Sequence, residues 1–175
     1  MTGFRVTSVV IFALAALSIV GGCRVELDAA DEARSRTGSV TVYFNSAGTR
    51  PQQHTADYAD QLLVQSIDTA RTEIDFAVMG FTKSDVIDAL VRAHYRGVRL
   101  RFVGDAAHLE SDTWGYQVMD RLGIPMMVGN FYRIMHLKFF VIDRRFVFVG
   151  TGNISSTDMA RNDNNWMLID SPPVA

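Results

Sequence analysis

The sequence predicts an α/β domain in which a mixed, largely parallel sheet is flanked by helices on both faces. Short β-prone runs alternate with amphipathic segments of helical period between residues 39 and 128, and this order favours parallel crossovers. The composition, 48% hydrophobic and 21% charged over 175 residues, suits one domain with a real core. The formal net charge of -2 provides no overall basic field for nucleic acid.

Residues 1–23 carry the features of a bacterial export signal. Arg5 supplies a positive charge, Val9–Val20 is an apolar run, and Val20-Gly21-Gly22-Cys23 resembles a lipobox. The run is short for a membrane-spanning helix, which needs about 20 apolar residues. We therefore expect cleavage and lipidation at Cys23, the only cysteine, giving an exported cell-envelope protein anchored to the membrane. A plain export signal and an uncleaved anchor are the alternatives.

Residues 24–38 are polar and acidic, which predicts a tether between this anchor and a domain over residues 39–175. Alternating, continuous apolar and 3.6-period patterns predict the elements of that domain. In order, they are a strand at Ser39–Phe44, a helix at His54–Arg71, a strand at Ile74–Met79, a helix capped by Thr82 and ended by Gly97, a strand at Val98–Val103, a helix at Ser111–Leu122 and a strand at Ile124–Val128. The loops 104–110 and 129–133 follow strands, so Asp105, His108 and Tyr132 are candidates for substrate contact.

The most informative stretch begins at His136. In a strand, His136 and Lys138 would share one face, and Phe139–Ile142 and Phe146–Val149 predict a hairpin that turns at Asp143. The hairpin would bring Gly150 to Asn153 back alongside His136. An imidazole, an ammonium, the Thr151 hydroxyl and the Asn153 amide together suit an anionic tetrahedral group.

These residues fit the pattern H-x-K-x4-D-x6-G-[S/T]-x-N, and the chain therefore resembles the phospholipase D superfamily from about Ser39 to Asp170. The resemblance implies one phospholipase D-like lobe in which His136, Lys138 and Asp143 are catalytic. It implies that Lys138, Thr151 and Asn153 hold the substrate phosphate. The family chemistry needs no metal and no other cofactor.

The resemblance also implies two motif histidines, one that attacks phosphorus to form a phosphohistidine and one that protonates the leaving oxygen. This chain has one, because His54, His94 and His108 lack a lysine two residues later. We expect a homodimer or the second lobe of a longer chain to supply the other. Relatives usually continue beyond the position of Ser171–Ala175, so truncation at the C-terminus is an open alternative.

Asn164 departs from the family pattern, since many relatives place a glutamate there to orient the nucleophilic histidine. An amide can accept a hydrogen bond from imidazole but cannot stabilise imidazolium as a carboxylate does. Asp163 would serve if the register differs by one residue.

Three functions remain open. The first is phosphodiester hydrolysis or transphosphatidylation on phospholipid, favoured by the anchor and the low net charge. The second is an endonuclease of the same superfamily, with nucleic acid as partner, and the third is a non-catalytic phosphate-binding lobe. A basic cluster of Arg133, Lys138, Arg144 and Arg145 is expected around the site, although turn arginines are often only solvated.

Overall fold

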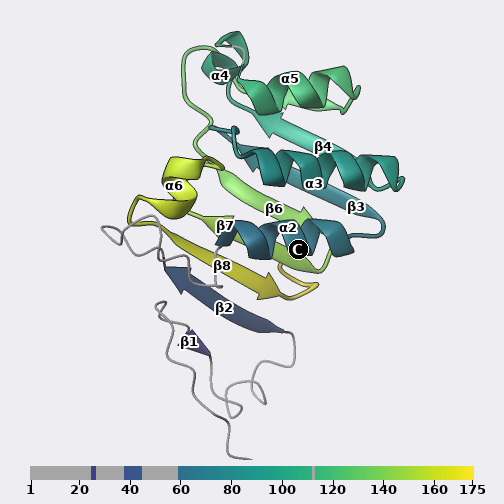
Figure 1. The fold of residues 1–175 in the computed structure, drawn as a ribbon, viewed down its shortest axis with the longest axis vertical. Helices are drawn as coiled ribbons and strands as arrows, with labels where there is room; N and C mark the ends of the chain where they lie inside the picture. Colours follow the sequence, from purple (N-terminus) through teal and green to yellow (C-terminus); the bar gives the residue numbers. More distant parts are fainter. Residues whose placement is uncertain (1–24, 27–37, 45–58, 112) are drawn as a thin grey trace, which may run out of the picture.

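The computed structural model describes residues 25–26, 38–44, 59–111 and 113–175. Their strands form one eight-stranded sheet in the order β1-β2-β8-β7-β6-β3-β4-β5 (Figure 1). The strands are β1 (Val25–Glu26), β2 (Ser39–Phe44), β3 (Glu73–Val78), β4 (Arg99–Gly104), β5 (Met126–Val128), β6 (Lys138–Ile142), β7 (Phe146–Gly150) and β8 (Asn165–Asp170). The predicted signal segment, Cys23 and most of the predicted tether lie outside the described residues.

The sheet is mixed, as predicted, but it is not largely parallel. Only the β3–β4 and β4–β5 pairs are parallel, and the five remaining pairs are antiparallel. The first half of the domain makes the expected parallel crossovers. The β6–β7 hairpin then reverses the chain, and β8 and β2 extend the sheet by further antiparallel pairs. The apolar pattern of a single strand does not specify which strand it pairs with or in which direction.

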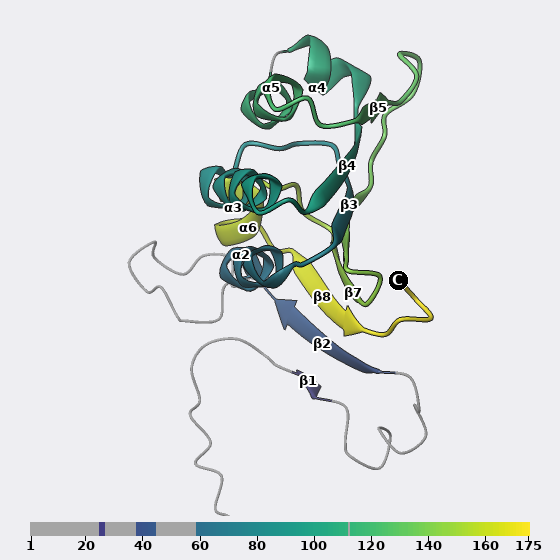
Figure 2. The same ribbon diagram turned by 90° about the vertical axis from the view of Figure 1, so that its right-hand side faces the viewer.

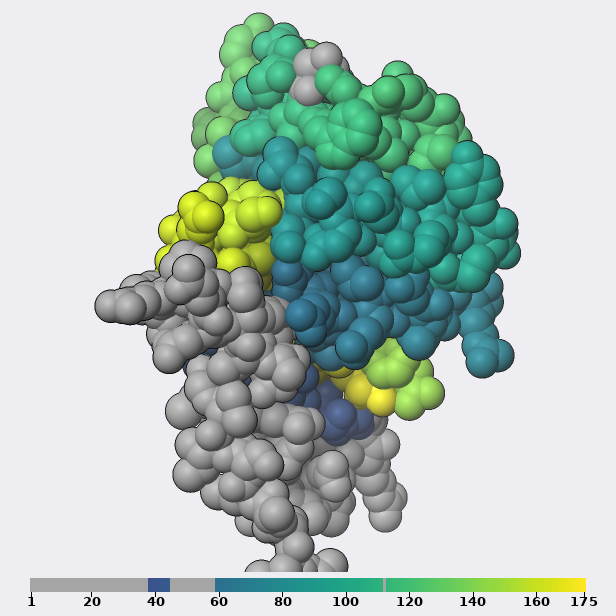
Figure 3. Space-filling view, in the orientation of Figure 1, coloured from purple at the N-terminus to yellow at the C-terminus, as the bar shows by residue number. Residues whose placement is uncertain are grey.

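The described helices all lie against one face of the sheet, so the expectation of helices on both faces is corrected (Figure 2). On that face α2, α3 and α6 cover the middle of the sheet (Figure 3). The helices are α2 (Ala59–Thr69), α3 (Ser84–Tyr95), α4 (Ala106–Glu110), α5 (Trp114–Arg121) and α6 (Ser156–Ala160). In the part of the chain that the structure describes, no helix is long and apolar enough to cross a membrane.

Two short helices were not predicted, because each is started by one capping side chain and carries no apolar pattern of its own. The Asp105 carboxylate accepts hydrogen bonds from the backbone N–H groups of Ala107 and His108, so α4 begins within a predicted loop. The Ser155 hydroxyl caps the short helix α6, which no apolar pattern in the sequence predicts, by accepting from Asp158 N. Single turns of this kind carry too little periodicity to be recognised from an apolar pattern.

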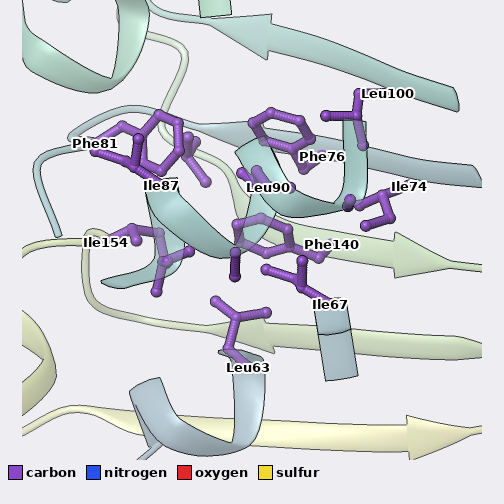
Figure 4. Close-up of a cluster of buried hydrophobic side chains, with 14 of the residues drawn as sticks. Leu63, Ile67, Ile74, Phe76, Phe81, Ile87, Leu90, Leu100, Phe140 and Ile154 are labelled. Atoms are coloured by element: carbon purple, nitrogen blue, oxygen red, sulfur yellow. The ribbon is translucent and has the colours of Figure 1, made fainter. Parts of the chain in front are cut away.

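A row of aromatic rings forms the centre of the core. The ring centroid of Phe76 lies 4.7 Å from that of Phe102 and 5.3 Å from that of Phe140, and both pairs are stacked. Phe148 and Trp166 continue the row at a centroid separation of 5.3 Å. Leu90 and other aliphatic side chains of the helices pack over this row (Figure 4). Withdrawal of these rings from water, worth ~1.5–3 kcal/mol for a side chain of this size, holds the helices on this face.

One edge of the sheet gathers the ends of strands that are distant in sequence. Val78 at the end of β3 pairs with Lys138 at the start of β6, and Gly150 at the end of β7 pairs with Trp166 near the start of β8. We call this the site edge, and in Figure 1 it lies on the left, beside α6. The hairpin therefore returns Gly150 towards the residues just before β6, as the sequence predicted.

Candidate active site

His136 lies two residues before the start of β6, and its side chain is exposed. Two contacts fix its backbone: Met135 N donates to the buried Asp105 carboxylate at 2.9 Å, and Lys138 Nζ donates to the His136 carbonyl oxygen at 2.9 Å. Within the described residues, no hydrogen bond to the imidazole ring is seen. The ring is therefore presented to solvent from a fixed backbone, as a nucleophile that meets an external substrate requires.

Lys138 is a buried cation at the first position of β6. Its exposed fraction is 5%, and burial lowers its pKa below the usual 10.5, with Asp158 partly opposing that shift. The His136 carbonyl takes one of its three N–H donors. On burial, this ammonium loses the water molecules that accepted its hydrogen bonds. A phosphate group would supply acceptors in their place, together with a compensating negative charge.

Asn153 is held by the carbonyl end of its side-chain amide and by its backbone N–H. Its Oδ1 accepts the Gly80 backbone N–H at 3.2 Å, which fixes the carbonyl end of the side chain towards Gly80. Asn153 N donates to Asp158 Oδ2 at 2.9 Å. The contact with Gly80 is so close that a Cβ there would lie 3.0 Å from Asn153 Cγ. The NH₂ group is thus the end of Asn153 that can donate to a phosphate oxygen.

Thr151 and Asn164 bind each other instead of meeting His136. Thr151 Oγ1 donates to Asn164 Oδ1 at 2.9 Å and accepts from Asn165 N at 3.2 Å, while Asn164 Nδ2 donates to the Asp158 carbonyl at 2.8 Å. The expected contact in which Asn164 orients His136 is not formed. Asn164 fastens the loop that carries Asn153 to α6, because both ends of its amide are occupied.

Asp143 lies at the opposite end of β6, roughly 17 Å from Lys138 at ~3.3 Å per strand residue. Its carboxylate accepts hydrogen bonds from Arg71 N, Thr72 N and Thr72 Oγ1, the last two at 2.8 Å. The motif placed Asp143 among the catalytic residues, and the geometry makes it a residue of the far turn. Arg144 and Arg145 share that turn, where they pair with Glu73 and Asp170, so of the expected basic cluster only Arg133 and Lys138 remain near the site.

Two carboxylates support the site: Asp158, which the sequence did not single out, and Asp105, which was expected to contact substrate and instead binds neighbouring protein groups. Asp158 in α6 binds the Asn153 backbone, and Asp105 binds both Met135 N and His108 Nδ1, the latter at 3.0 Å. Burial by itself would raise the pKa of Asp105, but the bonds from His108 and Met135 outweigh it and keep the pKa lowered. The spacing from Ser155 to Asp158 is a capping pattern that could have revealed α6.

No group of three or more His, Cys, Asp or Glu side chains close enough to hold a metal occurs in the described ranges. What the site edge provides is one exposed imidazole, one buried ammonium and one amide that is fixed by its oxygen. That combination, on an open sheet with this strand order, is the one expected of a lobe of the phospholipase D class.

Comparisons with known proteins lead to the same class. Residues 63–175 match the family described as cardiolipin synthase, PLD-like domain, and the chain belongs to this family within the phospholipase D superfamily. The structure is similar to the crystal structure of Nuc, a phospholipase D family member from Salmonella typhimurium, with a TM-score of 0.64 and 26% identity. That match covers 78% of this chain and 86% of Nuc.

Two curated relatives are also similar. Phospholipase D of Rickettsia bellii is 29% identical over 127 residues, which are 73% of this chain and 61% of the relative. Mitochondrial cardiolipin hydrolase of Drosophila melanogaster is 35% identical over 81 residues, or 46% of this chain and 32% of the relative. The chain thus spans from about a third to three fifths of the length of these relatives.

Proposed function

We propose that the chain is a phospholipase D-type phosphodiesterase in which His136 is the nucleophile and phospholipid is the substrate. The observation that carries the proposal is the arrangement of three groups at one sheet edge: the exposed His136, the buried ammonium of Lys138 and the amide of Asn153, which is fixed by its oxygen. The names of the relatives, phospholipase D and cardiolipin hydrolase, agree with it.

The reaction is expected to proceed in two displacements. A ring nitrogen of His136 attacks phosphorus, the bond from phosphorus to the leaving alcohol oxygen breaks, and a second histidine gives that oxygen a proton. Water, or an alcohol in the case of transfer, then attacks phosphorus while the second histidine takes its proton, and the phosphorus–nitrogen bond breaks. Lys138 and Asn153 stabilise the charge on the non-bridging oxygens throughout.

The second histidine has to come from outside the motif of this chain. We propose that a second copy, or a second lobe of a longer chain, supplies it by two-fold pairing at the site edge. His136 is exposed at that edge, so a partner can approach it.

We also propose an exported, membrane-anchored location. It rests on the sequence of residues 1–23 and on Cys23. Growth with an inhibitor of the lipoprotein signal peptidase should leave the precursor uncleaved, and unaltered processing would exclude lipidation at Cys23.

His136→Ala tests the proposed function. We expect turnover of phosphatidylglycerol or phosphatidylcholine to fall by at least ~10²-fold, the lower end of what a positioned histidine contributes. A binding module would instead keep its affinity and show no turnover to lose. His94→Ala is a matched control, because His94 lies in the last turn of α3, near the start of β4 and away from the site edge.

Single- and double-stranded DNA should be assayed beside the lipids. A preference for DNA that depends on His136 would replace the phospholipid proposal with the endonuclease alternative. No turnover of any of these diesters by the chain in its paired form would favour a phosphate-binding lobe.

A further inference from the structure

The connection between β5 and β6 contains four exposed side chains that are aromatic or aliphatic. Phe131 is 68% exposed, Tyr132 95%, Ile134 65% and Leu137 54%. We call residues 131–137 the apolar loop. Single exposed apolar residues are normal on a soluble surface, but four within seven residues form a patch of the kind that marks an interaction site.

The backbone of the apolar loop is fixed at both ends. Gly129 N donates to the Gly104 carbonyl at 3.0 Å, and Met135 N donates to the Asp105 carboxylate at 2.9 Å. Within the loop, Tyr132 N donates to Asn130 Oδ1 at 3.1 Å. Figure 2 shows the connection after β5 projecting beyond the body of the fold. The exposed side chains are therefore displayed by a tethered turn, and they do not fold back onto the core.

The position of the loop links it to the site. It contains His136 and leads directly into Lys138, so whatever covers the loop is brought to the candidate nucleophile. Met127, on the edge strand β5 that precedes the loop, is also exposed, at 72%.

The charge of the segment identifies the kind of partner. Between residues 129 and 138 the basic side chains are Arg133, His136 and Lys138, and there is no aspartate or glutamate. Lys138 is buried, so Arg133 is the exposed cation of the loop. Aromatic and aliphatic side chains next to such a cation suit the boundary between headgroups and acyl chains of an anionic bilayer, at a depth of about 5–10 Å.

We propose that the apolar loop inserts into the surface of an anionic phospholipid bilayer and so delivers a headgroup phosphate to His136. This inference rests on the proposed function and adds how the enzyme meets its substrate. Single-stranded nucleic acid could also bind such a surface, because its bases stack on exposed aromatic rings and its phosphates bind cations. Ile134 and Leu137 have no ring face to stack on a base, yet they are more than half exposed, which favours lipid.

Tryptophan probes test the insertion itself in the full chain. Tyr132→Trp places a probe in the apolar loop. Tyr95→Trp places a matched probe at the end of α3, where the native tyrosine is exposed too, at 76%. Emission is measured on vesicles of phosphatidylglycerol and phosphatidylcholine in equal parts, with and without brominated acyl chains. The emission of the parent chain, which contains Trp114 and Trp166, is subtracted.

We expect a blue shift and quenching by brominated lipid for the probe at position 132 and neither for the probe at position 95. Because each probe reports its own position, an N-terminal anchor cannot produce this difference. Equal responses at both positions, or none at position 132, would overturn the proposal. A response at position 132 to a single-stranded oligonucleotide and not to vesicles would replace the lipid partner with nucleic acid.

Activity separates this inference from the proposed function. In the double variant Phe131→Ser/Ile134→Ser, turnover of phosphatidylglycerol in vesicles should fall by about tenfold or more, because a buried apolar side chain changes partition by about that factor. Turnover of the water-soluble diester bis(p-nitrophenyl) phosphate should stay within about twofold of the parent. Equal loss on both substrates would contradict a role in membrane insertion. Failure of the parent chain to hydrolyse either diester would instead contradict the proposed function.

Discussion

Asp143 stabilises the turn at the far end of β6. Its carboxylate collects N–H donors from Arg71, Thr72 and Glu73, the residues that lead into β3. Its φ angle of 53° lies in the left-handed region, which aspartate and asparagine tolerate better than most residues. The residue therefore joins the β6–β7 hairpin to β3, at the end of β6 opposite to Lys138.

Asp143→Ala should lower the free energy of unfolding by about 2–3 kcal/mol, since several backbone donors lose a charged acceptor. Asp143→Asn keeps one acceptor oxygen and a residue suited to the turn, so we expect about half that loss. Urea unfolding measures both. Turnover per folded molecule should stay near that of the parent, and a 100-fold loss in a stably folded Asp143→Asn variant would return this residue to the active site.

The pH dependence of the same variant has a definite sign. Burial would raise the pKa of Asp143, but the bonds from Thr72 and Arg71 outweigh it and hold the pKa below the usual 3.8. The stabilisation is therefore present above pH 3.8 and is lost as the pH falls through the lower, folded-state pKa. The stability difference between the parent and Asp143→Asn should shrink over that acid range and stay constant above it.

Tyr116 of α5 ties together the strand ends at the site edge. Its hydroxyl accepts the Asp105 backbone N–H at 2.7 Å and lies 2.8 Å from the Met79 carbonyl, to which it donates. The ring packs so closely on β4 that a Cβ at Gly104 would lie 2.5 Å from it. One helix side chain thus sets where the chain leaves β3 and where it leaves β4.

Tyr116→Phe should cost about 1–3 kcal/mol of stability, because a buried N–H and a carbonyl lose their partner. Burial raises the pKa of Tyr116 to about 12, so the parent should also lose stability as the pH rises from about 10 to about 12. The phenylalanine variant should lack that contribution. Alkaline unfolding curves of identical slope for the two proteins would contradict the assignment.

The elements with strong patterns were predicted closely, and the strand at Ser39–Phe44 has the predicted bounds. The α4 and α6 turns were missed because a single capping side chain, Asp105 or Ser155, decides them. The hairpin predicted that His136, Lys138 and Asn153 would meet at one edge. The same hairpin predicted that Asp143 lies in the turn at the far end of the strand, which conflicts with the catalytic role that the motif implied. The motif could not show that Asn164 binds Thr151, because that contact depends on the pairing of β7 and β8.

At the scale of the molecule, the chain provides half of the expected pair of histidines. The site edge is open and His136 is exposed, which allows two copies to face each other there. Two-fold pairing would bring the same residue from each copy to one phosphate.

Mixing experiments test this pairing in the full chain. Parent and His136→Ala chains are unfolded together in equal amounts and refolded. If two chains pair at random, about a quarter of the pairs contain two intact copies of His136. We expect activity near that fraction, and sedimentation should show that the active species has twice the chain mass. Activity in a strict monomer, or activity proportional to the intact chain, would contradict a shared site.

The most direct test of the account is the covalent intermediate. The chain should be mixed with a phosphodiester, stopped in alkali, where a phosphorus–nitrogen bond to histidine survives, and mapped by peptide mass spectrometry. We predict an adduct of the phosphoryl half of the substrate on the peptide that contains His136, and none in His136→Ala. Full turnover with no adduct, or an adduct on another histidine such as His108, would contradict the assignment of His136 as the nucleophile.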